Sequence, residues 1–311
     1  MPKSMKNMVL LAKQEVTTGV DPIPTPAANS MLVRAMTPSI ITADFVERNN
    51  LRGFKGNFGS LAVGVHRMFE FEVELASSGT AGAAPKWGPL LMACGFSQTL
   101  VALASAAYQP ISVGDTTVTL YGYLDELLFK MTACKGTVSF ELNSKAIPVM
   151  KFKFLGEYSA ATDTPFPTGM DFTGFQQPLT VGKVNTPTFS FFGFPAIAQS
   201  LSFDVANSLV YRDLINLSGP FSSDRKPTGS ATIELPTAAA ANFGEIARLG
   251  TMGALNLVHG TAAGQIVQVA MPKLQLTSAP TISNDNEIAM LAVGFAINPN
   301  LGNDEIVITA R

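Results

Sequence analysis

The chain has 311 residues, of which 47% are hydrophobic and only 14% are charged. A typical soluble domain has about 25% charged residues, so this composition indicates that other protein subunits cover much of the folded surface. The formal net charge of −2 argues against a general nucleic-acid binder, which carries a basic face. No run approaches the roughly 18 consecutive apolar residues of a membrane helix, so we expect no membrane contact.

The cysteine content and the first residues bear on the compartment. Cys94 and Cys134 are the only cysteines, and both lie among apolar or small residues. Two thiols do not make a disulfide framework, so we expect buried, reduced cysteines and folding in a reducing cytoplasm. Lys3 and Lys6 are not followed by an apolar core with a cleavage site, so the sequence does not predict secretion.

The first 60 residues alternate between short strands and irregular stretches. Strands are expected at residues 8–12 and 31–36, separated by a Pro-, Thr- and Ala-rich arm or loop at 20–30. We expect residues 39–50 to be irregular, and the Gly- and Asn-bearing stretch 52–60 to be a loop.

The clearest strand of the chain spans residues 68–75. Apolar residues alternate there with Glu70, Glu72 and Glu74, the period of two that is typical of a strand with one buried face. Three carboxylates on one face could also suggest a calcium site or a glycosidase pair, but no Asp/Asn/Gly ligand loop accompanies them. We favour a solvated face, and a further interpretation is an acidic stripe that lines a channel.

The rest of the first half predicts one helix and two strand pairs. A small-residue loop at 77–84 leads into a helix over 85–95, where Pro85 suits a first turn and Gly95 a stop. A hairpin around Asp125 and Glu126 then precedes two alternating strands. If these last strands pair antiparallel, Glu141 can face a lysine across the sheet. The strands are expected at residues 118–123, 127–134, 137–142 and 150–155.

A linker separates this half from a second one of the same plan. Residues 159–187 are rich in Pro and Gly, and their phenylalanines imply a segment docked on a surface. A helix is expected over 241–250. Strands are expected at residues 200–204, 231–235, 255–259, 266–277 and 288–297, with a last edge strand within 302–311.

The order of elements in the second half repeats that in the first, although few residues are identical. We therefore predict a mainly β protein that contains the same β-rich unit twice, with one helix in each. The predicted division is a first unit at residues 1–160, a Pro/Gly-rich linker at 161–190 and a second unit at 191–311.

No set of residues predicts catalysis. His66 and His259 are the only histidines and lie in different units, so turn or surface histidines at strand ends are favoured over a triad or metal site. The acidic stretch 284–287 resembles part of a calcium loop but lacks its glycine and later glutamate, which favours a hairpin turn. Asp224, Arg225 and Lys226 are expected to form a charged loop end. We predict no enzyme, no cofactor and no metal site.

Many weak matches in the same order give the chain its resemblance to a known family. It resembles the major tail tube proteins of long-tailed, siphovirus-like bacteriophages, of a type with a duplicated domain. The matching stretches are residues 45–52, 69–75, 79–95, 136–143, 175–179, 224–229 and 302–305.

The resemblance implies two tandem tail-tube-like domains, each a β-sandwich or β-barrel with one flanking helix. Their sheets would join those of neighbouring subunits into a barrel around a DNA-wide lumen. Most such proteins have one unit and form hexameric rings, so a duplicated chain would form a trimeric, pseudo-sixfold ring, with a hexamer as the alternative. Glu70, Glu72 and Glu74 are the candidate lumen-facing residues, because lysine or arginine would grip DNA phosphates. Loops at 20–30, 52–60 and 77–84 are candidates for contacts between rings.

Two functions from different classes follow. The first is a structural virion protein, assembled in the host bacterial cytoplasm, whose stacked rings form the tail tube for DNA ejection. Its partners would be further copies of itself and the tape measure, tail terminator and distal tail proteins, while viral DNA passes through without specific binding. The alternative is a two-domain β-sandwich binding module that recognises a host receptor or carbohydrate. The single tryptophan, Trp87, lies in the predicted helix, where core packing is favoured over ligand binding.

Overall fold

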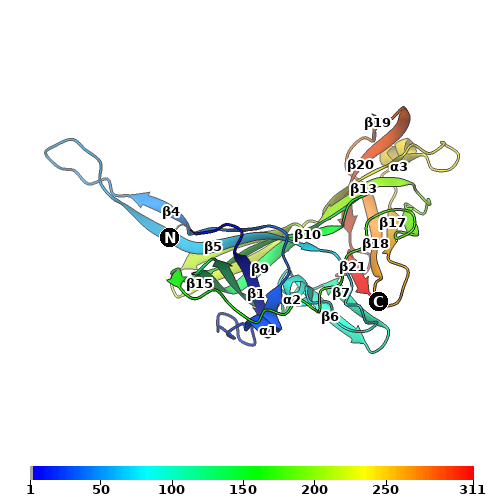
Figure 1. The fold of residues 1–311 in the computed structure, drawn as a ribbon. Coiled ribbons are helices and arrows are strands. Elements are labelled where there is room, and N and C mark those ends of the chain that lie inside the picture. Colours follow the sequence, from blue (N-terminus) through cyan, green and yellow to red (C-terminus); the bar gives the residue numbers. More distant parts are fainter. Residues whose placement is uncertain (1–2) are drawn as a thin grey trace.

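A computed structural model describes residues 3–311 and shows a mainly β protein, as the alternating sequence predicts. Figure 1 shows two β-rich bodies joined by strands that cross between them, and a long arm that extends from the first body away from the second. The pairing is antiparallel throughout, and nearly all strands belong to one connected network.

Six strands of the first unit pair in the order β1–β8–β9–β10–β5–β3. Short β2 also pairs with β1, β11 with β9, and β6 with β7. The bounds are β1 Met8–Gln14, β2 Ser30–Met31, β3 Met36–Pro38, β5 Ser60–Glu74, β6 Phe96–Val101, β7 Ser105–Pro110, β8 Val118–Leu124, β9 Leu127–Asn143, β10 Val149–Tyr158 and β11 Thr162–Asp163.

Six strands of the second unit pair in the matching order β12–β17–β18–β20–β16–β13. In addition, β19 pairs with the start of β20 and β21 with β18. The bounds are β12 Thr188–Phe191, β13 Ala198–Asp204, β16 Thr228–Glu234, β17 Gly253–His259, β18 Val267–Leu276, β19 Thr281–Asp285, β20 Ile288–Asn298 and β21 Val307–Ala310. The two units thus share one order of strands; the residue boundaries given above stay a prediction.

Two strand pairs join the units. The second half of β9 pairs with β13, so that one sheet runs from β3 in the first unit to β19 in the second. We call this the long sheet. The other pair is β7 with β21, where Tyr108 stands opposite Ile308. Both units therefore share hydrogen-bonded backbone, and Figure 1 shows β9, β10 and β13 crossing the middle of the molecule.

The helices are short, and their ends follow from local chemistry. They are α1 Pro26–Asn29, α2 Gly88–Met92 and α3 Phe243–Leu249. The predicted helix over 85–95 is too long, because Pro89 has no N–H to donate to the Pro85 carbonyl, which accepts from Gly88 instead. The predicted helix at 241–250 is confirmed: Asn242 caps its start, and Gly250 ends it with a φ of 64°.

Each unit carries a hairpin that the sequence did not reveal. Residues 39–50 are not irregular as expected, because β4 Thr42–Glu47 pairs with the first part of β5. This hairpin, residues 42–65, is the arm of Figure 1. In the second unit, β14 Asn207–Leu214 pairs with β15 Leu217–Arg225. We call residues 207–225 the second hairpin.

A single large core runs through both units. At the junction, the stacked rings of Phe140 on β9 and Phe203 on β13 lie 4.5 Å apart between centroids, and both are fully buried. Trp87 lies in this core and donates from its ring nitrogen to the Ala76 carbonyl at 2.7 Å. Within residues 3–311, no helix is long and apolar enough to cross a membrane.

Candidate functional surface

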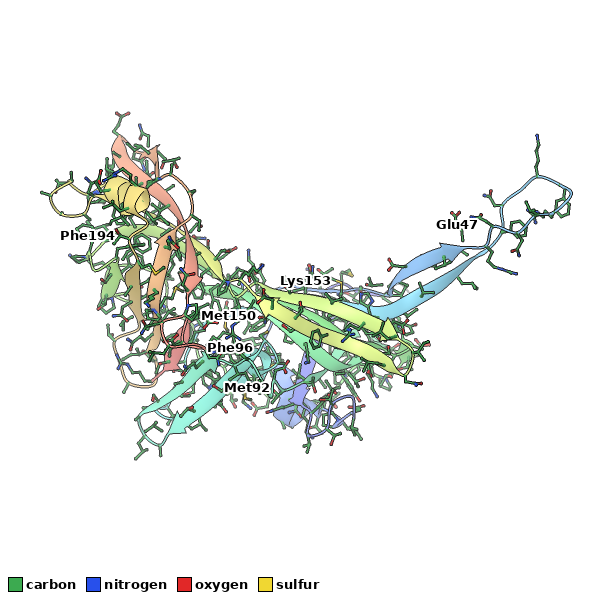
Figure 2. All side chains as sticks on the ribbon, turned by 180° about the vertical axis from the view of Figure 1, so that it is seen from behind. Glu47, Met92, Phe96, Met150, Lys153 and Phe194 are labelled. Carbon is green, nitrogen blue, oxygen red and sulfur yellow. The ribbon has the colours of Figure 1, made fainter. Side chains whose placement is uncertain are left out.

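One face of the long sheet carries mostly polar or small side chains. Along β5, Glu70 is exposed, Glu72 and Glu74 are half-buried, and the intervening Phe71 and Val73 point into the core. The alternation predicted for this strand is therefore confirmed, and its register on β10 places Glu72 opposite Lys151 and Glu70 opposite Lys153. In Figure 2, Lys153 stands at the surface of this sheet, whereas Met150 of the same strand is buried.

The charges of the first unit form a ladder. The Lys151 ammonium lies 2.6 Å from a Glu141 carboxylate oxygen and 4.0 Å from one of Glu72. Its hydrogen bond to Glu141 raises the pKa of Lys151. Lys153 pairs with Glu70 at 3.1 Å. The expectation that Glu141 faces a lysine is confirmed, and the acidic stripe proves to be interleaved with two lysines.

The same face of the second unit carries fewer charged groups than that of the first, and Glu234 of β16 is one of them. Its strands β13, β16 and β20 contain no lysine or arginine. Ser202 and Ser230 stand opposite each other with their hydroxyl oxygens 2.9 Å apart, and Gly294 continues the row on β20. Asp204 adds an acidic group, which accepts from the Ala206 N–H at 2.7 Å. Across both units this face therefore carries more carboxylates than ammonium groups, and Lys151 and Lys153 of β10 lie beside glutamates.

The second hairpin lies on the first unit. The ring of Tyr211 stacks on His66 with 4.9 Å between centroids, and the Asp213 carboxylate accepts from the Gly64 N–H at 3.0 Å. At the base of the hairpin, the Asn207 side chain donates to the carbonyls of Cys94 and Gly136. The hairpin therefore binds its own chain across the junction between the units.

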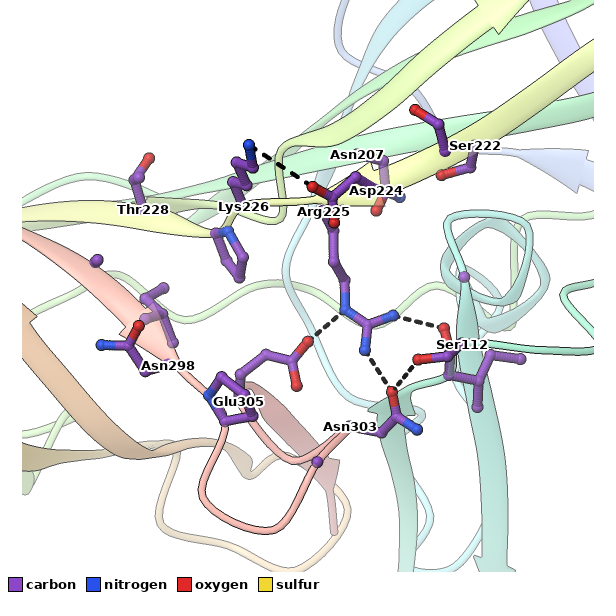
Figure 3. Close-up of a pocket in the computed structure, with 18 of the residues that line it drawn as sticks. Ser112, Asn207, Ser222, Asp224, Arg225, Lys226, Thr228, Asn298, Asn303 and Glu305 are labelled. Carbon is purple, nitrogen blue, oxygen red and sulfur yellow. Dashed lines mark hydrogen bonds and ion pairs between the residues drawn. The ribbon is translucent and has the colours of Figure 1, made fainter.

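A cleft of about 700 Å³ is lined by the base of this hairpin and by residues of the second unit (Figure 3). Arg225 crosses it, donating to the carboxylate of Glu305, to the Asn303 side-chain oxygen at 2.6 Å and to the Ile111 carbonyl at 2.5 Å. Lys226 pairs with Asp224 at 3.7 Å at the edge. The expectation of a charged loop end is thus right for Lys226 and Asp224 but wrong for Arg225, which the partners around it draw inward.

Two polar atoms of this cleft lack a partner among the described residues. They are the second carboxylate oxygen of Glu305 and the side-chain nitrogen of Asn298. Glu305 is only 4% exposed, so its free oxygen is held away from solvent. A buried polar group without a partner costs about 1–3 kcal/mol of stability. A polar surface that bound in the cleft and paired with these atoms would remove this cost.

The residues with the most familiar chemistry are scattered. His66 lies under the second hairpin. His259 is buried beside Thr186 and the Leu179 carbonyl, and burial lowers its pKa. Cys94 and Cys134 are free and buried, and burial raises the pKa of both thiols. Within residues 3–311, no cluster of three His, Cys, Asp or Glu side chains could hold a metal ion.

The sequence did not predict the two hairpins or the cleft. A signal for the second hairpin was present at Asn216, which takes a φ of 66° in the turn between β14 and β15, a conformation that asparagine tolerates. Arg225 and Glu305 are 80 residues apart in the chain, so no local pattern could have paired them.

Comparison with known proteins bears on this architecture. Among curated proteins, none matches the chain. A family model described as phage tail tube protein matches residues 5–297, which is nearly the whole chain. The chain therefore belongs to the phage tail tube protein family.

Proposed function

We propose that three copies of this chain close into a ring with pseudo-sixfold symmetry, and that stacked rings form the tail tube through which viral DNA is ejected. Membership of the family supports a structural role in the virion tail. One observation carries the finer proposal: two units with the same order of strands are joined edge to edge through β9 and β13. Repeating this junction between chains is a heterologous contact, which gives a ring if the rotation closes.

The ring count rests on the duplication. If each unit fills one of six places around the tube, three chains suffice; six chains per ring is the alternative. Closing the long sheet through neighbours also protects its edges from aggregation. Tape measure, tail terminator and distal tail proteins would be its partners in the tail, and assembly would occur in the cytoplasm of the host bacterium.

Electron microscopy of the purified chain tests this proposal. Image averages along the axis should show stacked rings or hollow tubes with six similar densities, which alternate between two kinds when three chains build the ring. Six identical densities would mean six chains per ring. A monodisperse monomer at high concentration would contradict assembly and favour the receptor- or carbohydrate-binding alternative.

The polar face of the long sheet is the candidate lining of the lumen. Its carboxylates outnumber its ammonium groups, and Lys151 and Lys153 each pair with a glutamate. Such a surface repels phosphates or leaves them unbound, so DNA slides past without being held. Glu70, Glu72 and Glu74 therefore remain the proposed lumen-facing residues.

Charge reversal tests the lumen face. Replacing Glu70, Glu72 and Glu74 with lysine should leave tubes intact, because these side chains are not in the core, but slow DNA ejection by roughly tenfold or more. Glutamine at the same positions is the control, since it removes charge without adding a cation. Ejection at the normal rate from tubes that carry all three lysines would show that this face does not line the lumen.

A further inference from the structure

The two hairpins occupy the same place in their units. The arm lies between β3 and the part of β5 that pairs with β10, and the second hairpin lies between β13 and β16. In Figure 1 both extend toward the same side, the second hairpin across the first unit and the arm beyond it. One hairpin is therefore docked on a unit, whereas the other has no unit beneath it.

The pairing registers give each residue a counterpart in the other unit. Leu75 donates to the Pro148 carbonyl, and Leu235 donates to the Ala289 carbonyl in the same way. From there the registers run in parallel: Met68 stands opposite Leu155 as Thr228 stands opposite Ala296. Counting along the strands, Lys226 is the counterpart of His66, and Asn298 is the counterpart of Glu157.

These counterparts show which place in the first unit the cleft of the second unit corresponds to. In the first unit, His66 contacts the second hairpin through Tyr211, and Glu157 lines a hollow beneath its residues 217–221. In the second unit, Lys226 and Asn298 line the cleft of Figure 3. The cleft is thus the place where a hairpin would lie if the second unit were covered as the first is. It also holds the unpartnered atoms of Asn298 and Glu305.

The arm has the surface expected of a hairpin that awaits a partner. Phe45 is 65% exposed and Leu61 60% exposed, although both lie within paired strands. Figure 2 shows the arm carrying its side chains beyond the rest of the molecule, with Glu47 on it. Exposed apolar residues gathered on one element mark an interaction site.

The outer edges of the long sheet also have counterparts at the internal junction. On one edge, Thr281 of β19 stands opposite Ala292. The counterpart of this pair in the first unit is Ser139 of β9 opposite Lys151 of β10. On the other edge, Thr37 of β3 stands opposite Glu70 as Ser202 of β13 stands opposite Ser230. Because Ser202 pairs with Glu141 at the internal junction, the corresponding pair between chains is Thr37 with Ser283.

We propose that a second copy of the chain joins the second unit by the two contacts that already join the units within the chain. Its β3 pairs antiparallel with β19, with Thr37 opposite Ser283, and its arm lies in the cleft beside Arg225. This rests on the proposed ring and specifies its interface. Ile282 on β19, which is 69% exposed, then stands opposite Pro38 of the second copy, as Phe140 stands opposite Phe203 at the internal junction. Pro38 has no N–H, so this junction has one hydrogen bond fewer than the internal one.

Disulfide cross-linking tests the register. Thr37→Cys with Ser283→Cys should link neighbouring chains in assembled tubes, giving covalent species of two and three chains on a non-reducing gel. Directly opposite residues in an antiparallel pair lie within the Cα spacing that a disulfide needs. Ser202→Cys with Glu141→Cys is the matched internal control, and its link forms within one chain. Thr37→Cys with Asp285→Cys is shifted by two residues and should not link.

The outcomes separate the interface from the proposed function. Tubes in which the internal control links but Thr37→Cys with Ser283→Cys does not would overturn this interface and leave the tube intact. An absence of tubes for the unaltered chain would overturn both. Linking by the shifted pair alone would also overturn the register.

Hydrogen exchange tests the docking of the arm. Amides of residues 222–228, at the base of the second hairpin, should exchange at least roughly tenfold more slowly in tubes than in the isolated chain, because the arm covers the cleft. A variant whose arm is shortened by deleting residues 48–59 should show less of this protection. Equal exchange in tubes and isolated chains would contradict the arm in the cleft.

Discussion

Corresponding strands of the long sheet are paired at the internal junction and unpaired at the two outer edges. At the junction, Phe140 is fully buried against Phe203, and a hairpin covers the adjoining face. At the outer edge, Ile282, the counterpart of Phe140, is 69% exposed, and the adjoining cleft has no hairpin over it. This difference, an apolar residue that is exposed in one unit and buried at the same place in the other, supports the proposed junction between chains.

The comparison also separates what must be alike from what can differ. The register of β5 on β10 matches that of β16 on β20, because backbone hydrogen bonds fix it. The side chains on the polar face differ, with Glu and Lys paired on the first unit and mainly Ser, Thr and small residues, with Asp204 and Glu234, on the second. The two units therefore share a strand order and a register but not the chemistry of their polar face.

Truncation of the two counterparts should give the largest contrast. Phe140→Ala should lower the free energy of unfolding of the isolated chain by about 3–5 kcal/mol, because it leaves a cavity beside Phe203. Ile282→Ala should change it by less than about 0.5 kcal/mol, as for an exposed site, yet weaken tube assembly. Chemical denaturation of the unassembled chain, with sedimentation for assembly, measures both. Equal destabilisation by the two substitutions would refute the comparison.

The two hairpins offer a smaller contrast. Tyr211→Ala should destabilise the isolated chain by about 1 kcal/mol, because it removes the stack on His66. Phe45→Ala on the arm should leave stability almost unchanged but reduce assembly. Hydrogen exchange of the second hairpin reports the first effect locally. If Phe45→Ala destabilises the isolated chain as much as Tyr211→Ala does, the arm is already docked without a second copy.

The sequence predicted those elements whose signal is local. The alternation in β5 and β16 was readable because one face is buried, and α3 was readable from Asn242 and Gly250. In contrast, β4 is exposed along most of its length, so it has no alternation of buried and exposed residues to detect. The sequence also divided β9 in two near Gly136, whereas the strand is continuous from Leu127 to Asn143. Its pairing with β10 shifts register between Thr132 and Lys135.

The candidate surface was predictable only in part for the same reason. The three glutamates of β5 were visible as a stripe, but Lys151 and Lys153 come to lie between carboxylates only through a register that joins distant segments. The cleft depends on Arg225 and Glu305 meeting across the fold. Long-range pairing, rather than composition, decides which charges are neighbours.

His259 holds the linker on the second unit. Its ring contacts Thr186 at 2.9 Å and the Leu179 carbonyl at 3.2 Å, and burial lowers its pKa from the ordinary value of 6.5. The folded state therefore favours the neutral ring, whereas the unfolded chain takes up a proton near pH 6.5. The contribution of this site to the free energy of unfolding is fully present above that pH. It decreases as the pH drops below it, by at most about 1.4 kcal/mol per pH unit.

Denaturation between pH 5 and 7.5 should show this loss in the unaltered chain, together with faster hydrogen exchange in residues 178–187. His259→Gln should remove most of the pH dependence in this range, because it has no proton to gain. His66→Gln is the matched control, since it removes the other histidine and leaves the linker contact in place. A pH dependence that survives in His259→Gln but disappears in His66→Gln would assign it to the hairpin contact of the first unit and contradict the role given to His259.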